Sequence, residues 1–119
     1  MFDVVVDPVG GSTRQLSLEA LTMGGRLVAM GNASGGDDLQ VSANTLWLRG
    51  KGILGFNLGG LSASDPSTVE PSLRRAVAEV FSGTLHVNVT RELALAEAAT
   101  AHEALESGAT TGKMVLFHG

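Results

Sequence analysis

The order of apolar and polar residues along the chain predicts alternating strands and helices. An apolar run over residues 2–6 breaks at a turn rich in Pro and Gly, and such a continuous run is typical of a strand covered on both faces in a parallel sheet. Ser12 is placed to cap a helix that we expect to reach about Met23, where a pair of glycines would end it. The sequence RLVAMG predicts a second strand over residues 26–30. A strand, helix and strand joined by short turns close right-handed, with the strands parallel.

The same alternation continues to the end of the chain. Ser67 and Glu70 predict a capping box at the start of a helix, because a Ser side chain and a Glu three positions later can bond to each other's backbone N–H groups. The polar residues 59–67 predict a loop, which is also the best candidate for a domain boundary. The expected elements are helices over residues 44–49, 67–82 and 95–107 and strands over residues 51–56, 86–90 and 113–117.

Composition and charge exclude several classes of protein. The 119 residues are 44% apolar and 17% charged, as in a globular domain rather than a disordered chain. Lys and Arg total 8 against 12 Asp and Glu, and the scattered basic residues disfavour a nucleic-acid partner. No apolar run approaches the roughly 18 residues of a membrane span, residues 1–3 lack the basic n-region of a signal peptide, and the sequence has no Cys. We therefore expect a cytoplasmic protein with no membrane partner, no disulfide and no thiolate metal site.

Candidate chemistry lies in three loops that follow predicted strands, at residues 8–11, 31–32 and 56–57. The carboxyl ends of parallel strands meet at one edge of an open α/β sheet, where such sheets bind ligands. Each glycine taken alone is compatible with a simple tight turn. Three such loops at one edge favour a binding site.

Familiar catalytic motifs are absent from the sequence. The dinucleotide fingerprint G-x-G-x-x-G does not occur, and GATTGK at residues 108–113 lacks the spacing and the Ser or Thr of a phosphate-binding loop. His86, His102 and His118 lie on different predicted elements, and no nucleophile elbow is present. Asp7 ends the first strand, but a single carboxylate supports no acid and base assignment. The sequence therefore assigns no catalytic residue and no metal ligand.

Four stretches of the chain, in order, resemble the medium-chain dehydrogenase/reductase superfamily, and specifically its quinone oxidoreductase-like branch. They are DVVVDPVGG, ALTMGGRLVAMGNASG, LWLRGKGILGFNLG and AHEALESGATTGKMVLF. The resemblance implies an α/β fold and covers only the carboxyl-terminal part of such an enzyme. It assigns residues 1–60 to the second half of a doubly wound, Rossmann-type NAD(P)-binding domain. Residues 61–119 become a helix and strand segment that returns to the catalytic domain.

The resemblance also implies which residues contact the cofactor, which in this branch is typically NADPH. One residue would pack near the ribose, two would follow the strand that approaches the nicotinamide, and two would end the strand whose backbone holds the carboxamide. A basic residue near the phosphates completes the set, although a solvent-facing Lys is an equally good interpretation of it. In that order the residues are Val9, Gly31 and Asn32, Phe56 and Asn57, and Lys113.

The implied reaction is hydride transfer from NADPH to a quinone or another conjugated carbonyl. We expect this chain alone to bind the cofactor weakly and to be inactive or nearly so, because it lacks the pyrophosphate fingerprint. The strand over residues 51–56 is expected to pair with its counterpart in a homodimer, with Lys51 as a mild deterrent. Two alternatives stay open: a non-enzymatic dimerisation or structural module of the same fold, and an enoyl reductase of the same superfamily.

Overall fold

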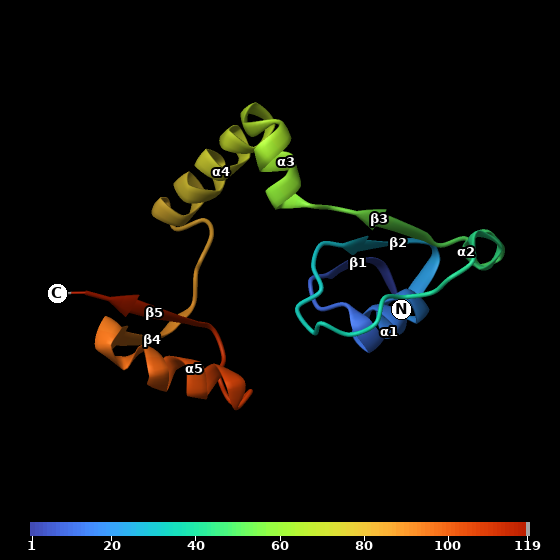
Figure 1. Cartoon of the computed structure of the whole chain (residues 1–119). Coiled ribbons are helices and arrows are strands. Elements are labelled where there is room, and N and C mark those ends of the chain that lie inside the picture. Colours follow the sequence, from blue (N-terminus) through green and yellow to red (C-terminus); the bar gives the residue numbers. More distant parts are fainter. Residues whose placement is uncertain (119) are drawn as a thin grey trace. The chain divides into compact units, whose positions relative to one another are not determined.

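The structure is a computed structural model that describes residues 1–118 of the chain. Helices alternate with parallel strands, which confirms the predicted α/β class (Figure 1). The chain divides into two compact units, Met1–Val69 and Glu70–Gly119. None of the helices within residues 1–118 is long and apolar enough to cross a membrane. The assignment of residues 1–60 and 61–119 to two domains of a larger enzyme stays a prediction.

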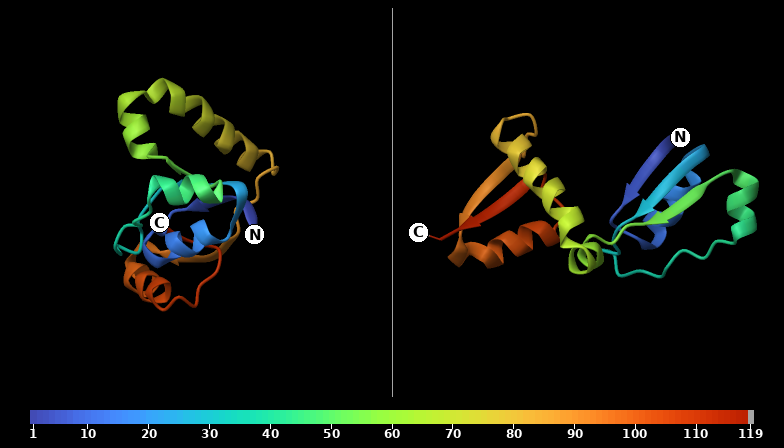
Figure 2. Two further views of the ribbon diagram at one scale, coloured as in Figure 1. Left: turned by 90° about the vertical axis from the view of Figure 1, so that its right-hand side faces the viewer. Right: turned by 90° about the horizontal axis from the view of Figure 1, so that it is seen from above.

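The first unit contains a three-stranded parallel sheet in the order β1-β2-β3. Its strands are β1 (Phe2–Asp7), β2 (Leu21–Ala29) and β3 (Gly52–Gly55), and α1 (Gly11–Glu19) packs on one face of the sheet (Figure 2). The register places Val6 beside Val28, and Val28 beside Leu54. All three loops at the carboxyl ends of these strands therefore lie at one edge of the sheet, as the sequence predicts.

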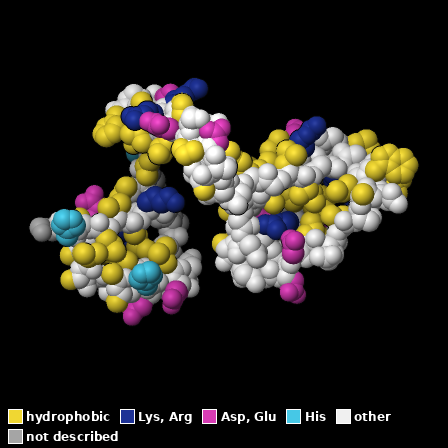
Figure 3. Space-filling model, turned by 45° about the horizontal axis from the view of Figure 1, so that its top comes forward, with side chains coloured by type: hydrophobic (Ala, Val, Ile, Leu, Met, Phe, Trp, Pro, Cys, Tyr) yellow, Lys and Arg dark blue, Asp and Glu magenta, His cyan; other side chains and the backbone are white. Residues whose placement is uncertain are grey.

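The core of this unit lies between α1 and the sheet. Leu18 from α1 and Leu21 and Leu27 from β2 are buried, and five partly buried residues pack around them: Val5, Leu39, Val41, Leu46 and Ile53. Full burial of one such Leu contributes about 2 kcal/mol. On the opposite face of the sheet, Val6 is 56% exposed and Leu54 51% exposed, and apolar side chains are visible at the surface of both units (Figure 3). Only the α1 side of the sheet is thus covered by residues 1–69.

Both ends of α1 differ from the prediction. The helix begins at Gly11, with Gly10 at the N-cap position and no side-chain cap, so the predicted cap by Ser12 is wrong. The helix ends at Glu19 rather than near Met23, and β2 begins at Leu21. Leu21 is fully buried and pairs with Phe2, whose backbone N–H donates to the Ala20 carbonyl over 2.9 Å. Burial of Leu21 as a strand residue therefore ends the helix, and the expected stop at the glycine pair is wrong, because both glycines lie inside β2.

Side-chain caps define the next helices. Ser42 caps α2 (Ala43–Arg49) by accepting the Thr45 N–H over 3.1 Å, close to the predicted start. Where the sequence predicts only a loop, Asn57 caps the short helix α3 (Leu58–Ser64) by accepting the Gly60 N–H over 2.9 Å. The loop prediction is wrong because a local amide cap compensates for the glycines in this helix.

Asp65, and not the predicted Ser67, caps α4 (Pro66–Phe81), because its Oδ1 accepts the N–H of Thr68 over 3.3 Å. The carboxylate of Asp65 accepts the hydroxyls of Ser67 over 2.5 Å and of Thr68 over 2.6 Å. These hydrogen bonds hold the pKa of Asp65 below its ordinary value. The predicted capping box of Ser67 and Glu70 is therefore wrong, and Glu70 instead bonds to Arg74 one turn later over 2.6 Å.

The second unit contains a two-stranded parallel sheet. The strand β4 (Val89–Ala94) leads through a short 3₁₀ turn, η1 (Leu95–Glu97), into α5 (Ala98–Glu106), and the chain returns as β5 (Lys113–Phe117). The predicted helix over residues 95–107 and the terminal strand are confirmed. The strand predicted over residues 86–90 lies three residues later, because Val89 to Ala94 are the residues that pair with β5.

Candidate functional site

The candidate site is an open cavity at the carboxyl edge of the first sheet. The cavity has a volume of about 450 Å³. The ends of β2 and β3 form most of its wall, and one side chain comes from α1. The lining residues are Arg14, Ala29, Met30, Gly31, Gly55, Phe56 and Asn57. Three of the predicted cofactor-binding residues, Gly31, Phe56 and Asn57, therefore surround one space.

Backbone hydrogen bonds join the loops around this cavity. The N–H of Ala33 donates to the Pro8 carbonyl over 3.1 Å, and the N–H of Ser34 donates to the Val9 carbonyl over 2.9 Å. The loop after β1 is thereby bonded to the loop after β2. These hydrogen bonds therefore fix Val9 relative to the segment that starts at Gly31.

Two glycines allow these loops to approach closely. A Cβ on Gly31 would lie 2.7 Å from the Pro8 carbonyl oxygen, closer than real Cβ atoms come. Gly10 has a φ of +76°, which favours glycine, and a Cβ there would overlap the Asn32 side chain. Both glycines are therefore required by the geometry of the loops, whatever binds there.

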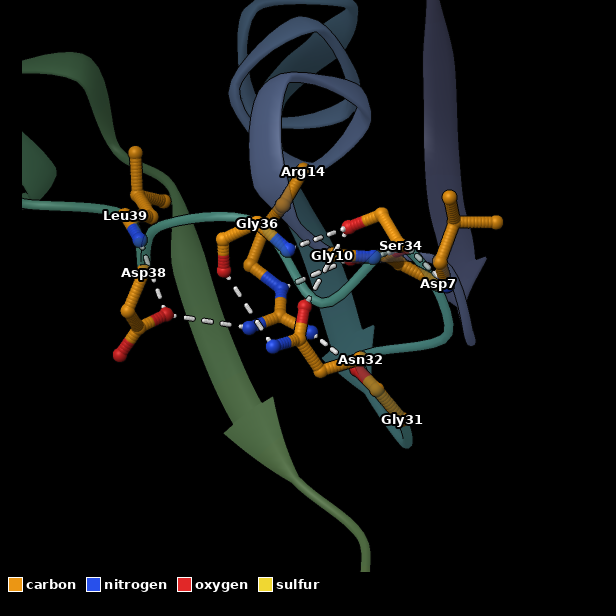
Figure 4. A network of polar contacts seen from close by, with 10 residues as sticks. Asp7, Gly10, Arg14, Gly31, Asn32, Ser34, Gly36, Asp38 and Leu39 are labelled. Atoms are coloured by element: carbon orange, nitrogen blue, oxygen red, sulfur yellow. Dashed lines mark hydrogen bonds and ion pairs between the residues drawn. The ribbon is translucent and has the colours of Figure 1, made fainter.

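A buried ion pair lies under the same loops (Figure 4). Asp7 ends β1 and is only 2% exposed. Its Oδ1 accepts the N–H groups of Val9 over 2.8 Å and Gly10 over 2.9 Å, and its Oδ2 accepts Nε of Arg14 over 2.7 Å. Burial raises the pKa of Asp7, but hydrogen bonds from Gly10, Arg14 and Val9 outweigh burial and hold that pKa below its ordinary value.

Arg14 connects this carboxylate to the loop after β2. Its Nη2 donates to the Gly31 carbonyl, and its Nη1 donates to Asp38 Oδ1 over 3.1 Å. The hydrogen bond to Asp7 raises the pKa of Arg14 above its ordinary value. One guanidinium therefore bonds to three different parts of the site (Figure 4).

Sequence reasoning missed Arg14. Two signals were available. The first is that a cation near the start of a helix opposes the helix dipole, so a basic residue in α1 four positions after Gly10 calls for an anionic partner. The other was Asp7, a carboxylate at the end of an apolar strand, because a buried charge is ordinarily paired. Sequence alone does not show that these two side chains meet.

The remaining predicted residues lie at the rim of the site or in the other unit. Val9 is 36% exposed, and Asn32 is exposed, with its Nδ2 donating to the Gly36 carbonyl over 3.3 Å. Lys113 begins β5 in the second unit and is exposed there. The structure thus groups five of the six predicted residues in the loops of the first unit, and Lys113 belongs to the second.

An open α/β sheet with a cavity at the carboxyl ends of its strands is typical of one half of a Rossmann-type ligand-binding domain. The family model described as zinc-binding dehydrogenase matches residues 1–116, so the chain belongs to that family.

The probable quinone oxidoreductase of Schizosaccharomyces pombe is 35% identical over 119 residues, which cover 97% of this chain and 34% of that protein. The 2-haloacrylate reductase of a Burkholderia species is 32% identical over 115 residues, covering 97% and 34%. The crystal structure of Escherichia coli quinone oxidoreductase complexed with NADPH superposes with a TM-score of 0.73 at 32% identity, covering 97% of this chain and 36% of that chain. The predicted resemblance is confirmed, and the chain spans about a third of the length of these relatives.

The family's name raises the question of a zinc ion. Zinc sites in proteins take Cys, His and carboxylate ligands in sets of three or four. The chain has no Cys, and residues 1–118 contain no group of three or more His, Asp or Glu side chains that could hold a metal. The residues that the structure describes therefore do not fit a zinc ion.

Proposed function

We propose that this chain forms the nicotinamide side of an NADPH site in an oxidoreductase that reduces a quinone or another conjugated carbonyl. The observation that carries the proposal is the cavity at the carboxyl edge, where the ends of β2 and β3 meet around Gly31, Phe56 and Asn57. In this role the cofactor supplies the hydride, and the protein supplies position and electrostatics.

The groups around the cavity fit a nicotinamide ring. Two peptide groups of this loop are already used, since the Phe56 N–H donates to Ala29 and the Asn57 carbonyl accepts from Leu61, both over 2.9 Å. Within residues 1–118, no hydrogen bond occupies the Phe56 carbonyl or the Asn57 N–H. One acceptor beside one donor complements a primary carboxamide, which carries both functions. Met30 and Phe56 add apolar surface beside the ring.

The relatives support the class of reaction. The Escherichia coli neighbour is a quinone oxidoreductase with NADPH bound, and the Schizosaccharomyces pombe relative is a probable quinone oxidoreductase. A 2-haloacrylate carries a carbon–carbon double bond conjugated to a carboxylate, so the Burkholderia relative keeps an enoyl-type reductase as the second candidate. We place Lys113 near the cofactor phosphates, although a purely solvent-facing role suits its exposure equally well.

Binding to the chain alone tests the cofactor role. We expect weak, saturable binding when the purified chain is titrated with NADPH, with amide NMR shifts concentrated at Gly31, Phe56 and Asn57. Quinone reduction by the same sample should be negligible, because the chain has no G-x-G-x-x-G turn for the pyrophosphate. Shifts confined to other residues would contradict the proposed site, and tight binding with rapid turnover would contradict the expected weakness.

A pair of glycine variants distinguishes the cavity from the fold. A Cβ on Gly55 would have no heavy atom within 4 Å, whereas a Cβ on Gly52 would lie 3.6 Å from the Arg26 side chain, an ordinary contact. Gly55→Val should fill the cavity and weaken NADPH binding about tenfold, which corresponds to about 1.4 kcal/mol. Gly52→Val, in the same strand but outside the cavity, should leave binding unchanged. Equal effects of the two variants would show that the cavity is not the binding site.

We also propose that β3 mediates homodimerisation. β3 is an edge strand of the first sheet, with Leu54 51% exposed. The deterrent expected from Lys51 does not operate, because its Nζ donates to the carbonyls of Leu18 and Glu19 over 2.8 and 2.9 Å. Light scattering should show a dimer that Leu54→Lys disrupts. Leu58 is about equally exposed but lies outside the strand, so Leu58→Lys should preserve the dimer. A monomer at all concentrations would exclude this role.

A further inference from the structure

We propose that Arg14 is a positioning residue that orders the wall of the cavity. No assigned cofactor contact involves Arg14, and its guanidinium bonds to Asp7, Gly31 and Asp38 together. The inference deepens the proposed function, on which its cofactor-binding consequence rests. Its structural consequence, the order of the segment from residue 31 to residue 34, is independent of any cofactor.

The geometry of the three bonds requires a guanidinium. Nε points to the buried carboxylate of Asp7, while Nη2 and Nη1 reach the Gly31 carbonyl and the Asp38 carboxylate. A guanidinium presents N–H groups in a rigid planar fork, whereas a Lys ammonium is a single compact charge. Lys at this position can pair with Asp7 but cannot also hold the Gly31 carbonyl in place.

Arg14 differs from the other restraints on this segment, which are neutral hydrogen bonds. Beyond the cavity wall, the N–H of Gly35 donates to the Asn32 carbonyl over 3.0 Å, and the N–H of Gly36 donates to Ser34 Oγ over 3.1 Å. Ala33 and Ser34 are held to the loop after β1 by one backbone hydrogen bond each. The Gly31 carbonyl, by contrast, is held by a charged donor that is itself fixed to the buried Asp7. Such charge-assisted bonds are about twice as strong as neutral ones.

Replacement of Arg14 by Lys should disorder the cavity wall without unfolding the unit. Asp7 keeps the N–H groups of Val9 and Gly10 as partners, and a Lys ammonium can still pair with its carboxylate. The effect should therefore be local, at the segment that contains Gly31. This local effect separates a positioning role from a general contribution to stability.

The test compares hydrogen exchange and cofactor binding in matched variants of the full chain. In Arg14→Lys, amide exchange at Ala33 and Ser34 should accelerate about tenfold, while exchange at β2 core residues changes about twofold or less. Arg14→Met, which also leaves the buried Asp7 without its cation, should accelerate exchange at both. NADPH affinity should fall at least about fivefold. Asp38→Asn, which keeps an acceptor for Arg14 and removes only the exposed negative charge, should change both readouts about twofold or less.

Lys51→Met supplies the stability control. Lys51 bonds to the far end of α1, through the Leu18 and Glu19 carbonyls, and is not among the residues that line the cavity. If this variant accelerates exchange at Ala33 as much as Arg14→Lys does, Arg14 acts only through stability and the proposal is overturned. Unchanged exchange in both Arg14 variants overturns it as well. If the wild-type chain binds no NADPH, the proposed function loses its cofactor, while the exchange data still decide the role of Arg14.

Discussion

The two units of the chain use their buried surface differently. The first buries Leu18, Leu21 and Leu27 together with the charged Asp7. In the second, over residues 70–118, only Ala101 is buried. The first unit therefore has a core of its own and a polar network tied to it. The second has a two-stranded sheet with little beneath it, and sheets of two strands are marginally stable by themselves.

This difference explains where a binding site can be built. Groups that bind a ligand must be held in place by residues that are themselves fixed by packing and hydrogen bonds. In the first unit, Arg14 stands on α1 and is bonded to Asp7 below it, so the Gly31 loop is supported from within. Lys113 in the second unit has no such support, since its side chain is exposed at the start of β5.

The largest effect is expected from truncation of a core side chain, which should destabilise the first unit alone. Leu27 is fully buried beneath α1, and truncation of such a Leu to Ala ordinarily costs about 2–5 kcal/mol in the free energy of unfolding. In Leu27→Ala, urea denaturation monitored by amide NMR should shift the midpoint of first-unit signals strongly. Leu116→Ala in β5, at a residue 37% exposed, should cost less. Equal shifts of both units in Leu27→Ala would show that they unfold together.

The next effect is electrostatic and depends on pH. The pKa of Asp7 in the folded chain lies below its ordinary value of 3.8. Protons therefore bind the unfolded chain more readily, so the stabilisation by Asp7 is complete above pH 3.8 and is lost as the pH falls through the folded pKa. Asp7→Asn should lower the melting temperature at pH 7 and flatten the decline below pH 4, as thermal unfolding between pH 2 and 7 would measure. An unchanged pH profile would contradict the assignment.

Much of the fold could be predicted because local runs of apolar residues indicate its strands. The apolar runs of β1 and β3 and the terminal strand lie where the sequence predicts them. The errors fall where tertiary contacts decide: burial of Leu21 ends α1 early, and pairing with β5 moves β4 to Val89–Ala94. The helix α3 replaces the predicted loop because Asn57, which the family resemblance assigns to the cofactor, also caps this helix.

The candidate site divides in the same way. Its loops could be predicted, since glycines after apolar strands mark the carboxyl edge of a parallel sheet. The ion pair of Asp7 and Arg14 could not, because it depends on the side of α1 that faces the loop and on a rotamer that reaches the Gly31 carbonyl. The periodicity of apolar residues predicts where strands and helices begin and end. Side-chain networks such as this ion pair depend instead on how those elements pack.

A smaller effect is expected at the carboxyl end of α1 in the first unit. Lys51 donates to the carbonyls of Leu18 and Glu19, which end α1 and have no helical partner of their own. Lys51→Met keeps most of the side-chain stem but loses both hydrogen bonds, so the free energy of unfolding should fall by about 1 kcal/mol. Chemical denaturation of the first-unit signals measures it. Lys51→Arg, which retains a donor, should recover part of the loss.

The smallest effect is expected at a surface pair of the second unit. Arg74 bonds to Glu70 over 2.6 Å, but the two side chains are 78% and 57% exposed. A pair four residues apart on a helix surface contributes only about 0.3–0.5 kcal/mol and weakens with salt. Glu70→Gln should therefore change second-unit unfolding by no more than this, and 1 M NaCl should remove the difference. A larger loss in Glu70→Gln would mean that this helix depends on its surface charges to replace the core that the second unit lacks.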